Sequence, residues 1–144
     1  RNRLARLTRQ SVPTAQVRSE GGVAVDLAYL IQPEELSREL FSRLSLAGFS
    51  LERLPESGPE LVERLTCNVS QRPRLVLLDA LLCNDVVQGF DGLGINNYSQ
   101  VWLRGDLTEE EIQWVYEWGL AGYLPDGLDI NVLVRKLERA LRAP

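Results

Sequence analysis

The chain has 144 residues, of which 44% are hydrophobic and 25% charged, with a formal net charge of −4. This is the composition of one globular domain, and it excludes a disordered tail. The sequence contains no histidine, which excludes Ser-His-Asp and Cys-His nucleophile pairs and histidine-bearing zinc sites. No apolar run approaches the roughly 18 residues of a membrane span, and no signal-peptide pattern opens the chain, so we expect a cytoplasmic protein.

The first 20 residues are basic, whereas the rest of the chain is acidic. They carry five arginines and one glutamate, which leaves 11 basic and 19 acidic residues for the remainder. Polar residues and Gly21-Gly22 follow the arginines, so the sequence predicts an Arg-rich interdomain linker over residues 1–22 and a folded domain over residues 23–144. No aromatic residues are interleaved for base stacking and the acidic body would repel phosphates, so we expect no nucleic-acid partner.

The first half of the domain alternates strand and helix patterns. An apolar run over 23–31 predicts a buried first strand, and Pro33, two glutamates and apolar residues at helical spacing predict a helix that Gly48 ends. Residues 49–54 alternate apolar and polar side chains, which is typical of a half-exposed strand at a sheet edge. A second helix is predicted over 57–65.

The second half continues the alternation around one strongly apolar strand. Residues 75–78 form an unbroken apolar run that ends at Asp79, as a central parallel strand requires. Three glycines and a weak helical period predict a short or irregular helix between 80 and 97. The remaining predicted elements are a strand at 101–103, a helix at 108–118 with a Thr108–Glu111 capping box, a strand at 121–124 and a last helix at 130–141. The fold class is therefore α/β, with a five-stranded parallel sheet covered on both faces.

Residues 23–142 resemble the receiver domain of bacterial response regulators. The resemblance rests on the alternation, on Leu75-Val76-Leu77-Leu78-Asp79 and on Gly122-Tyr123-Leu124-Pro125. It implies a flavodoxin-like (βα)5 fold with strand order 2-1-3-4-5. In that family an acid pair after the first strand and an aspartate after the third hold Mg²⁺, and the aspartate accepts a phosphoryl group. A Thr or Ser after the fourth strand and a Lys after the fifth contact the phosphate.

This sequence departs from the receiver pattern at most of those positions. Asp79 matches the phosphoacceptor, but the Thr or Ser position is Arg104 and the Lys position is Asp126. The acid pair falls within residues 30–32, Leu-Ile-Gln, which contain no carboxylate. Mg²⁺ prefers carboxylate and other oxygens, and aspartyl phosphorylation needs the metal to offset charge. We therefore expect a degenerate phosphoacceptor site with no metal and no catalytic residues.

Arg104 introduces a cation where the family has a hydroxyl. We expect it to pair with Asp79 or Asp126 across the strand ends in a bidentate arrangement that fixes this region in one state. The alternative is that all three are separate solvated loop charges.

The resemblance is therefore to a pseudo-receiver, similar to the C-terminal domain of cyanobacterial circadian input histidine kinases. That likeness implies a non-catalytic signalling domain that regulates an attached sensor histidine kinase and binds a protein partner. The implied partner is a clock protein of thioredoxin-like fold, and quinone is the one ligand that the likeness implies. The alternative function is an atypical receiver that is still phosphorylated on Asp79.

Two surfaces are candidates for the protein partner. The predicted edge strand contains no proline or lysine, which favours pairing with a strand of another chain; its residues are Ser50, Leu51, Glu52, Arg53 and Leu54. The alternative is an ordinary edge protected by its charges and short length. Trp114 and Trp118 lie opposite Ile112 on the predicted helix, and exposed tryptophans are typical of interfaces. The alternative is that Trp118 packs against the core and only Trp114 is half exposed.

Overall fold

The computed structural model describes residues 25–143, without the side chains of residue 69, residues 82–85 and residue 91. The linker predicted at residues 1–22 lies outside this range. Five parallel strands form one sheet in the order β2-β1-β3-β4-β5, as predicted. The strands are β1 (Leu27–Leu30), β2 (Leu51–Arg53), β3 (Leu75–Asp79), β4 (Gln100–Arg104) and β5 (Gly122–Leu124).

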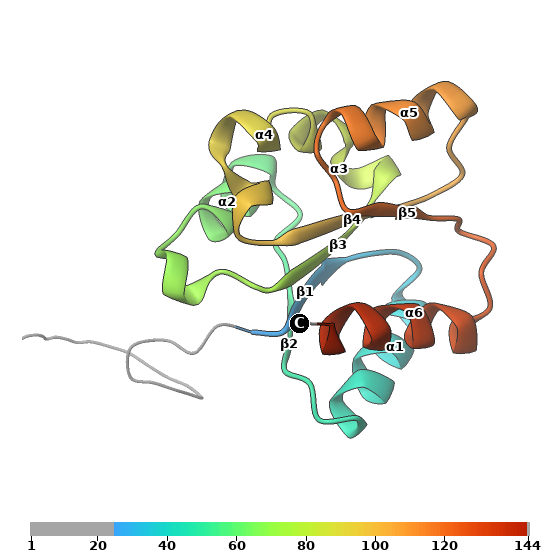
Figure 1. The fold of residues 1–144 in the computed structure, drawn as a ribbon. Helices are drawn as coiled ribbons and strands as arrows, with labels where there is room; N and C mark the ends of the chain where they lie inside the picture. Colours follow the sequence, from blue (N-terminus) through green and yellow to red (C-terminus); the bar gives the residue numbers. More distant parts are fainter. Residues whose placement is uncertain (1–24, 144) are drawn as a thin grey trace, which may run out of the picture.

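Helices cover both faces of the sheet (Figure 1). On one face lie α1 (Glu34–Leu46) and α6 (Ile130–Arg142), which contact each other. The other face carries α2 (Gly58–Leu65), α3 (Ala80–Val87), α4 (Phe90–Leu93) and α5 (Glu109–Glu117). Two 3₁₀ turns, η2 (Val69–Gln71) and η3 (Ile95–Asn97), complete the described elements.

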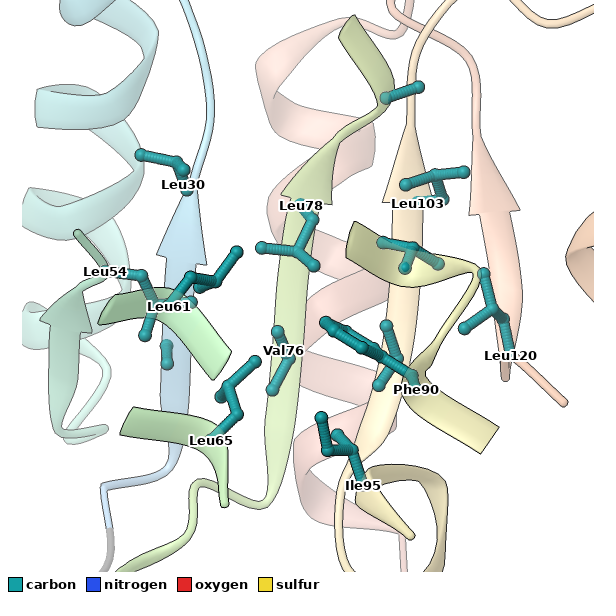
Figure 2. Close-up of a cluster of buried hydrophobic side chains, with 14 of the residues drawn as sticks. Leu30, Leu54, Leu61, Leu65, Val76, Leu78, Phe90, Ile95, Leu103 and Leu120 are labelled. Atoms are coloured by element: carbon teal, nitrogen blue, oxygen red, sulfur yellow. The ribbon is translucent and has the colours of Figure 1, made fainter. Parts of the chain in front are cut away.

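The core consists of two apolar clusters, one on each face of the sheet. Alternate residues of each strand point to opposite faces, so Val76 and Leu78 join one cluster and Leu75 and Leu77 join the other. Figure 2 shows the cluster on the α2–α5 side, where Phe90 is fully buried against the central strands. Because β3 is buried on both faces, its unbroken apolar run is explained.

Local signals set most of the helix ends. At the start of α5 the Thr108 side chain accepts from the Glu111 N–H and the Glu111 carboxylate accepts from the Thr108 N–H, which is the predicted capping box. Gly48 follows α1 with a φ of +99°, a conformation that favours glycine. The irregular region predicted at 80–97 is divided into α3, α4 and η3.

One sequence prediction about the strands is corrected. Within the described residues the first strand begins at Leu27, because the N–H groups of Asp26 and Leu27 both donate to the Ser50 carbonyl and the regular pairing starts only at the second of them; residues 23 and 24 of the predicted strand lie outside the described range. Among the described residues, no helix has the length and apolarity that crossing a membrane requires.

Candidate functional site

The carboxyl ends of the strands border an open cleft of about 660 Å³. Open α/β sheets place functional groups at this edge, because the loops after parallel strands meet there. The cleft contains all three residues predicted for the degenerate phosphoacceptor site. Its lining residues are Ile31, Gln32, Pro33, Glu34, Arg53, Glu56, Asp79, Arg104 and Asp126.

Asp79 and Arg104 form a buried ion pair at the base of this cleft. They end β3 and β4 as register partners, and Arg104 Nη1 lies 3.4 Å from Asp79 Oδ2. Asp79 is 5% exposed and Arg104 is 7% exposed. The same Asp79 oxygen accepts a hydrogen bond from the backbone N–H of Gln32 at 3.2 Å. The lone carboxylate is therefore held by one cation and one backbone donor.

The guanidinium of Arg104 also bonds to two loop carbonyls. Nη1 donates to the Gln32 carbonyl at 3.2 Å, and Nη2 donates to the Asp126 carbonyl at 3.1 Å. Arg104 thus links the loops that follow β1 and β5 through hydrogen bonds, and its guanidinium forms an ion pair with Asp79. The predicted pairing of Arg104 with Asp79 is confirmed. The predicted bidentate geometry is wrong, because Nη2 of Arg104 donates to a backbone carbonyl and not to the second oxygen of the Asp79 carboxylate.

The Asp126 carboxylate does not pair with Arg104, which was the other pairing that the sequence allowed. Residue Asp126 is exposed, and only its backbone carbonyl contacts Arg104 among the described residues. Its carboxylate therefore adds negative charge to the cleft and does not neutralise Arg104.

The residues of the cleft do not fit a magnesium ion. Residues 30–32 supply no carboxylate, and the inner oxygen of Asp79 already contacts Arg104 and the Gln32 N–H. Within the part of the chain that the structure describes, no group of three His, Cys, Asp or Glu side chains is placed to hold a metal. A cation at this position would also be repelled by the guanidinium.

The rim of the cleft carries a second, exposed charge network. Arg53 at the end of β2 lies 3.6 Å from a carboxylate oxygen of Glu34 and 3.2 Å from one of Glu56. These side chains are about half exposed, so each pair contributes at most about 1 kcal/mol. Arg53, predicted as a partner-binding residue, therefore lies at the mouth of the cleft that contains Asp79 and Arg104.

The predicted edge strand β2 is at the edge of the sheet. The Ser50 carbonyl accepts from the Leu27 N–H, and the Leu54 N–H donates to the Tyr29 carbonyl. In a parallel strand, alternate residues hydrogen-bond to the same neighbour. Ser50, Glu52 and Leu54 therefore face β1, whereas the backbone groups of Leu51 and Arg53 point to the free edge.

The Glu52 side chain is already engaged. Its two oxygens each lie 2.7 Å from a nitrogen of Arg64 at the end of α2, in a bidentate pair. The hydrogen bond with Glu52 is the largest influence on Arg64 and raises the pKa of its guanidinium, while burial opposes the shift. Arg64 also contacts the Cys67 thiol and the Gln71 carbonyl. This network anchors β2 to α2.

The two tryptophans of α5 lie together, with their ring centroids 5.9 Å apart and their planes 27° from parallel. Trp118 packs against the core cluster, and its carbonyl accepts from the Asn96 side chain at 2.8 Å. Both residues are half-buried. The alternative is therefore right that Trp118 packs against the core, but wrong that only Trp114 is half exposed. Of the two, Trp114 is the one that packs against neither core cluster.

Comparisons with known proteins identify the fold. No protein-family model matches the sequence, and no curated protein matches it significantly. The chemotaxis response regulator CheY4 of Vibrio cholerae has a TM-score of 0.66 at 15% identity, covering 82% of this chain and 99% of that one. A two-component response regulator from Legionella pneumophila has a TM-score of 0.64 at 19% identity, covering 82% and 98%.

A third similar structure is described as one of a family of redox sensors in the streptococci that evolved from two-component response regulators. Its TM-score is 0.64 at 20% identity, and the match covers 81% of this chain and 51% of that one. At such identities a structural match establishes the fold and nothing finer. The chain has the CheY-like receiver fold.

Sequence reasoning missed the part played by Gln32. Its N–H binds Asp79 and its carbonyl binds Arg104, so both contacts come from the backbone of a residue whose side chain is not involved. No residue-type pattern could have indicated it. The available signal was its position, which coincides with the acid pair of receivers in one of the two alignments that the resemblance allows.

Proposed function

We propose that this chain is a receiver-like signalling domain that acts by binding a protein partner and not by magnesium-dependent phosphoryl transfer. The observation that carries the proposal is the buried ion pair of Asp79 and Arg104. A receiver aspartate must be free to hold a metal and attack a phosphoryl group. Here the carboxylate is covered by a guanidinium, with Asp126 adding negative charge nearby.

A second candidate function is an atypical receiver that still accepts phosphate on Asp79. The observation in its favour is the same guanidinium, because arginine binds phosphate oxygens well and would offset part of the charge. Against it, the Asp126 carboxylate faces the same cleft, and two unit charges about 4 Å apart interact by about 4 kcal/mol at an effective dielectric near 20. The first candidate therefore has the stronger support.

The free edge of β2 is the proposed site for the partner. Leu51 and Arg53 direct backbone groups outward, and strand addition uses such unpaired groups. The strand is only three residues long, so an added strand would gain further contacts from the cleft mouth at Arg53. The Trp114 surface of α5 is the second proposed site, because tryptophan is frequent among residues that dominate binding energy.

Several finer proposals rest on the resemblance to pseudo-receivers of cyanobacterial circadian input kinases. We propose that the domain regulates an attached sensor histidine kinase in the cytoplasm. The proposed partner is a clock protein of thioredoxin-like fold, and a soluble quinone is the ligand to test.

The experiment is a titration of the labelled chain with a purified thioredoxin-like clock protein, followed by amide NMR. We expect shifts along β2, loss of binding in Leu51→Asp and unchanged binding in Trp114→Ala. Leu46→Asp is the control for placing a carboxylate at an exposed leucine outside the strand, because Leu46 is 88% exposed at the end of α1. Loss of binding in Trp114→Ala alone would assign the partner to α5, and no binding by the wild type would contradict the partner proposal.

A further inference from the structure

The region around α5 is strongly acidic and contains no basic residue. Residues 105–134 include no Lys or Arg, but they include seven acids: Asp106, Glu109, Glu110, Glu111, Glu117, Asp126 and Asp129. Elsewhere in the described chain the glutamates of α1 pair with arginines, as Glu34 and Glu39 do. Among the described residues, no ion pair involves an acid of α5.

Two of these acids flank Trp114. Residues spaced by three, four or seven lie on one side of a helix, so Glu110, Trp114 and Glu117 form a single stripe along α5. The ring of Trp118 stacks against that of Trp114 and supports it from the core side. We call Glu110, Trp114 and Glu117 the acidic–aromatic stripe.

The last residue of the stripe has unfavourable electrostatics. Glu117 ends α5, where the helix dipole is negative and a carboxylate is destabilised, and no basic residue lies in that turn. A cation bound there would offset both the dipole and the carboxylate charge. The stripe therefore favours a ligand with cationic groups spaced along an aromatic surface.

The chain itself contains a segment with this chemistry. Residues 1–9, RNRLARLTR, carry four arginines and two leucines and no acid. Guanidinium groups pair with carboxylates and stack on the faces of indole rings, and leucines would cover apolar ring surface. The charge of this segment is opposite to that of the stripe.

The length of the intervening chain allows this contact. Residues 10–24 separate the segment from Val25, and fifteen extended residues span up to about 50 Å. A domain of about 120 residues has a radius of gyration near 14 Å, so every face is within reach. Beside the start of β1, where the Arg74 N–H donates to the Val25 carbonyl, the Asp26 carboxylate already has a cationic partner in Arg74 at 3.3 Å, unlike the acids of α5.

From these observations we propose that residues 1–9 dock on the acidic–aromatic stripe of the same chain and cover Trp114. The contact joins guanidinium groups to Glu110 and Glu117 and stacks one of them on the indole. The proposal goes beyond the proposed function, because it requires neither an external partner nor a silent phosphoacceptor site. It makes the α5 surface available only when the segment is displaced.

A nitroxide spin label on the segment tests the contact in the whole chain. Ala5→Cys is labelled in a Cys67→Ser/Cys83→Ser background, and the indole N–H signals are recorded by NMR at low salt. We expect the indole N–H signal of Trp114 to lose most of its intensity. The signal of Trp102, which lies on the opposite face of the sheet, should keep its intensity. In 1 M salt the Debye length falls to about 3 Å and the intensity of Trp114 should recover.

Two matched double variants test whether the acids of the acidic–aromatic stripe hold residues 1–9 near Trp114. Glu110→Gln/Glu117→Gln should restore the Trp114 signal, whereas Glu60→Gln/Glu63→Gln removes the same charge from exposed residues of α2 and should not. A well-dispersed spectrum verifies that each variant is folded. Equal loss at Trp102 and Trp114, no recovery in the stripe variant, or broadening that appears only between separately labelled molecules would overturn the proposal.

Discussion

Asp79 and Arg104 occupy the same register position on neighbouring parallel strands, so their side chains leave the sheet side by side at its carboxyl edge. The 3.4 Å contact between them follows from this placement and needs no special loop conformation. A single residue type at the end of β4 therefore changes the electrostatics of the whole cleft. Where a hydroxyl would leave the aspartate free, arginine neutralises it and binds the adjacent loops.

Removing Arg104 should destabilise the fold strongly. Arg104→Met leaves the buried Asp79 carboxylate with one backbone donor, and breaking a buried pair in this way costs about 3 kcal/mol or more. Asp79→Leu/Arg104→Met should recover most of that loss, because a buried ion pair can be replaced by apolar side chains at little net cost. Urea unfolding of the wild type and both variants measures the difference.

The control for this comparison is Asp79→Asn, which keeps an acceptor for the Gln32 N–H and should cost less than Arg104→Met. If Arg104→Met lay within about 0.5 kcal/mol of the wild type, as exposed substitutions do, the ion pair would be no more than a surface contact.

Gly122 should not tolerate a side chain. It pairs in register with Trp102, and a Cβ at this position would lie 2.6 Å from a carbon of the indole ring. Gly122→Ala forces the ring or β5 to shift, which costs about 1–3 kcal/mol. Gly122→Ala/Trp102→Leu should be less destabilised than the sum of the single variants. Strict additivity in thermal unfolding would show that the two residues do not compete for space.

The capping box should contribute to the stability of α5. Thr108→Ala removes the acceptor for the Glu111 N–H and should lower the free energy of unfolding by about 1 kcal/mol. Thr108→Ser retains the oxygen and should stay close to the wild type. Chemical denaturation compares the three proteins, and equal loss in both variants would assign the effect to the threonine methyl group.

The two tryptophans of α5 should differ in their contribution to stability. Trp118 packs against the core cluster, so Trp118→Ala should cost about 3 kcal/mol, whereas Trp114→Ala should cost about 1 kcal/mol or less. Fluorescence quenching in Trp114→Phe and Trp118→Phe gives an independent measure, since Trp102 is common to both variants and the Trp114 ring left in Trp118→Phe should be more accessible than the Trp118 ring left in Trp114→Phe. The reverse order would contradict the described packing.

The element types could be predicted from sequence because the dominant signals are local and consistent, whereas the strand order was implied by the resemblance to receiver domains. The apolar run of β3 requires burial on both faces, and the Thr108 capping box fixes the start of α5. The spacing of apolar residues over 130–141 likewise defines α6 within one residue. These features depend on neighbours along the chain, which the sequence shows directly.

The details of the cleft depend on contacts between distant segments. That Arg104 would reach Asp79 follows from register, but its second nitrogen binds the carbonyl of Asp126, which is 22 residues away. Backbone carbonyls have no residue-type signature, so the bidentate pairing was the natural but wrong expectation.

The most direct test of the account is an amide NMR spectrum of the labelled chain with and without Mg²⁺ and beryllofluoride, which mimics an aspartyl phosphate. The account predicts an unchanged, well-dispersed spectrum, because Arg104 covers the Asp79 carboxylate and the cleft has no second metal carboxylate after β1. Shifts at Asp79, Arg104 and the loops after β1 and β5 would show a live phosphoacceptor and contradict it.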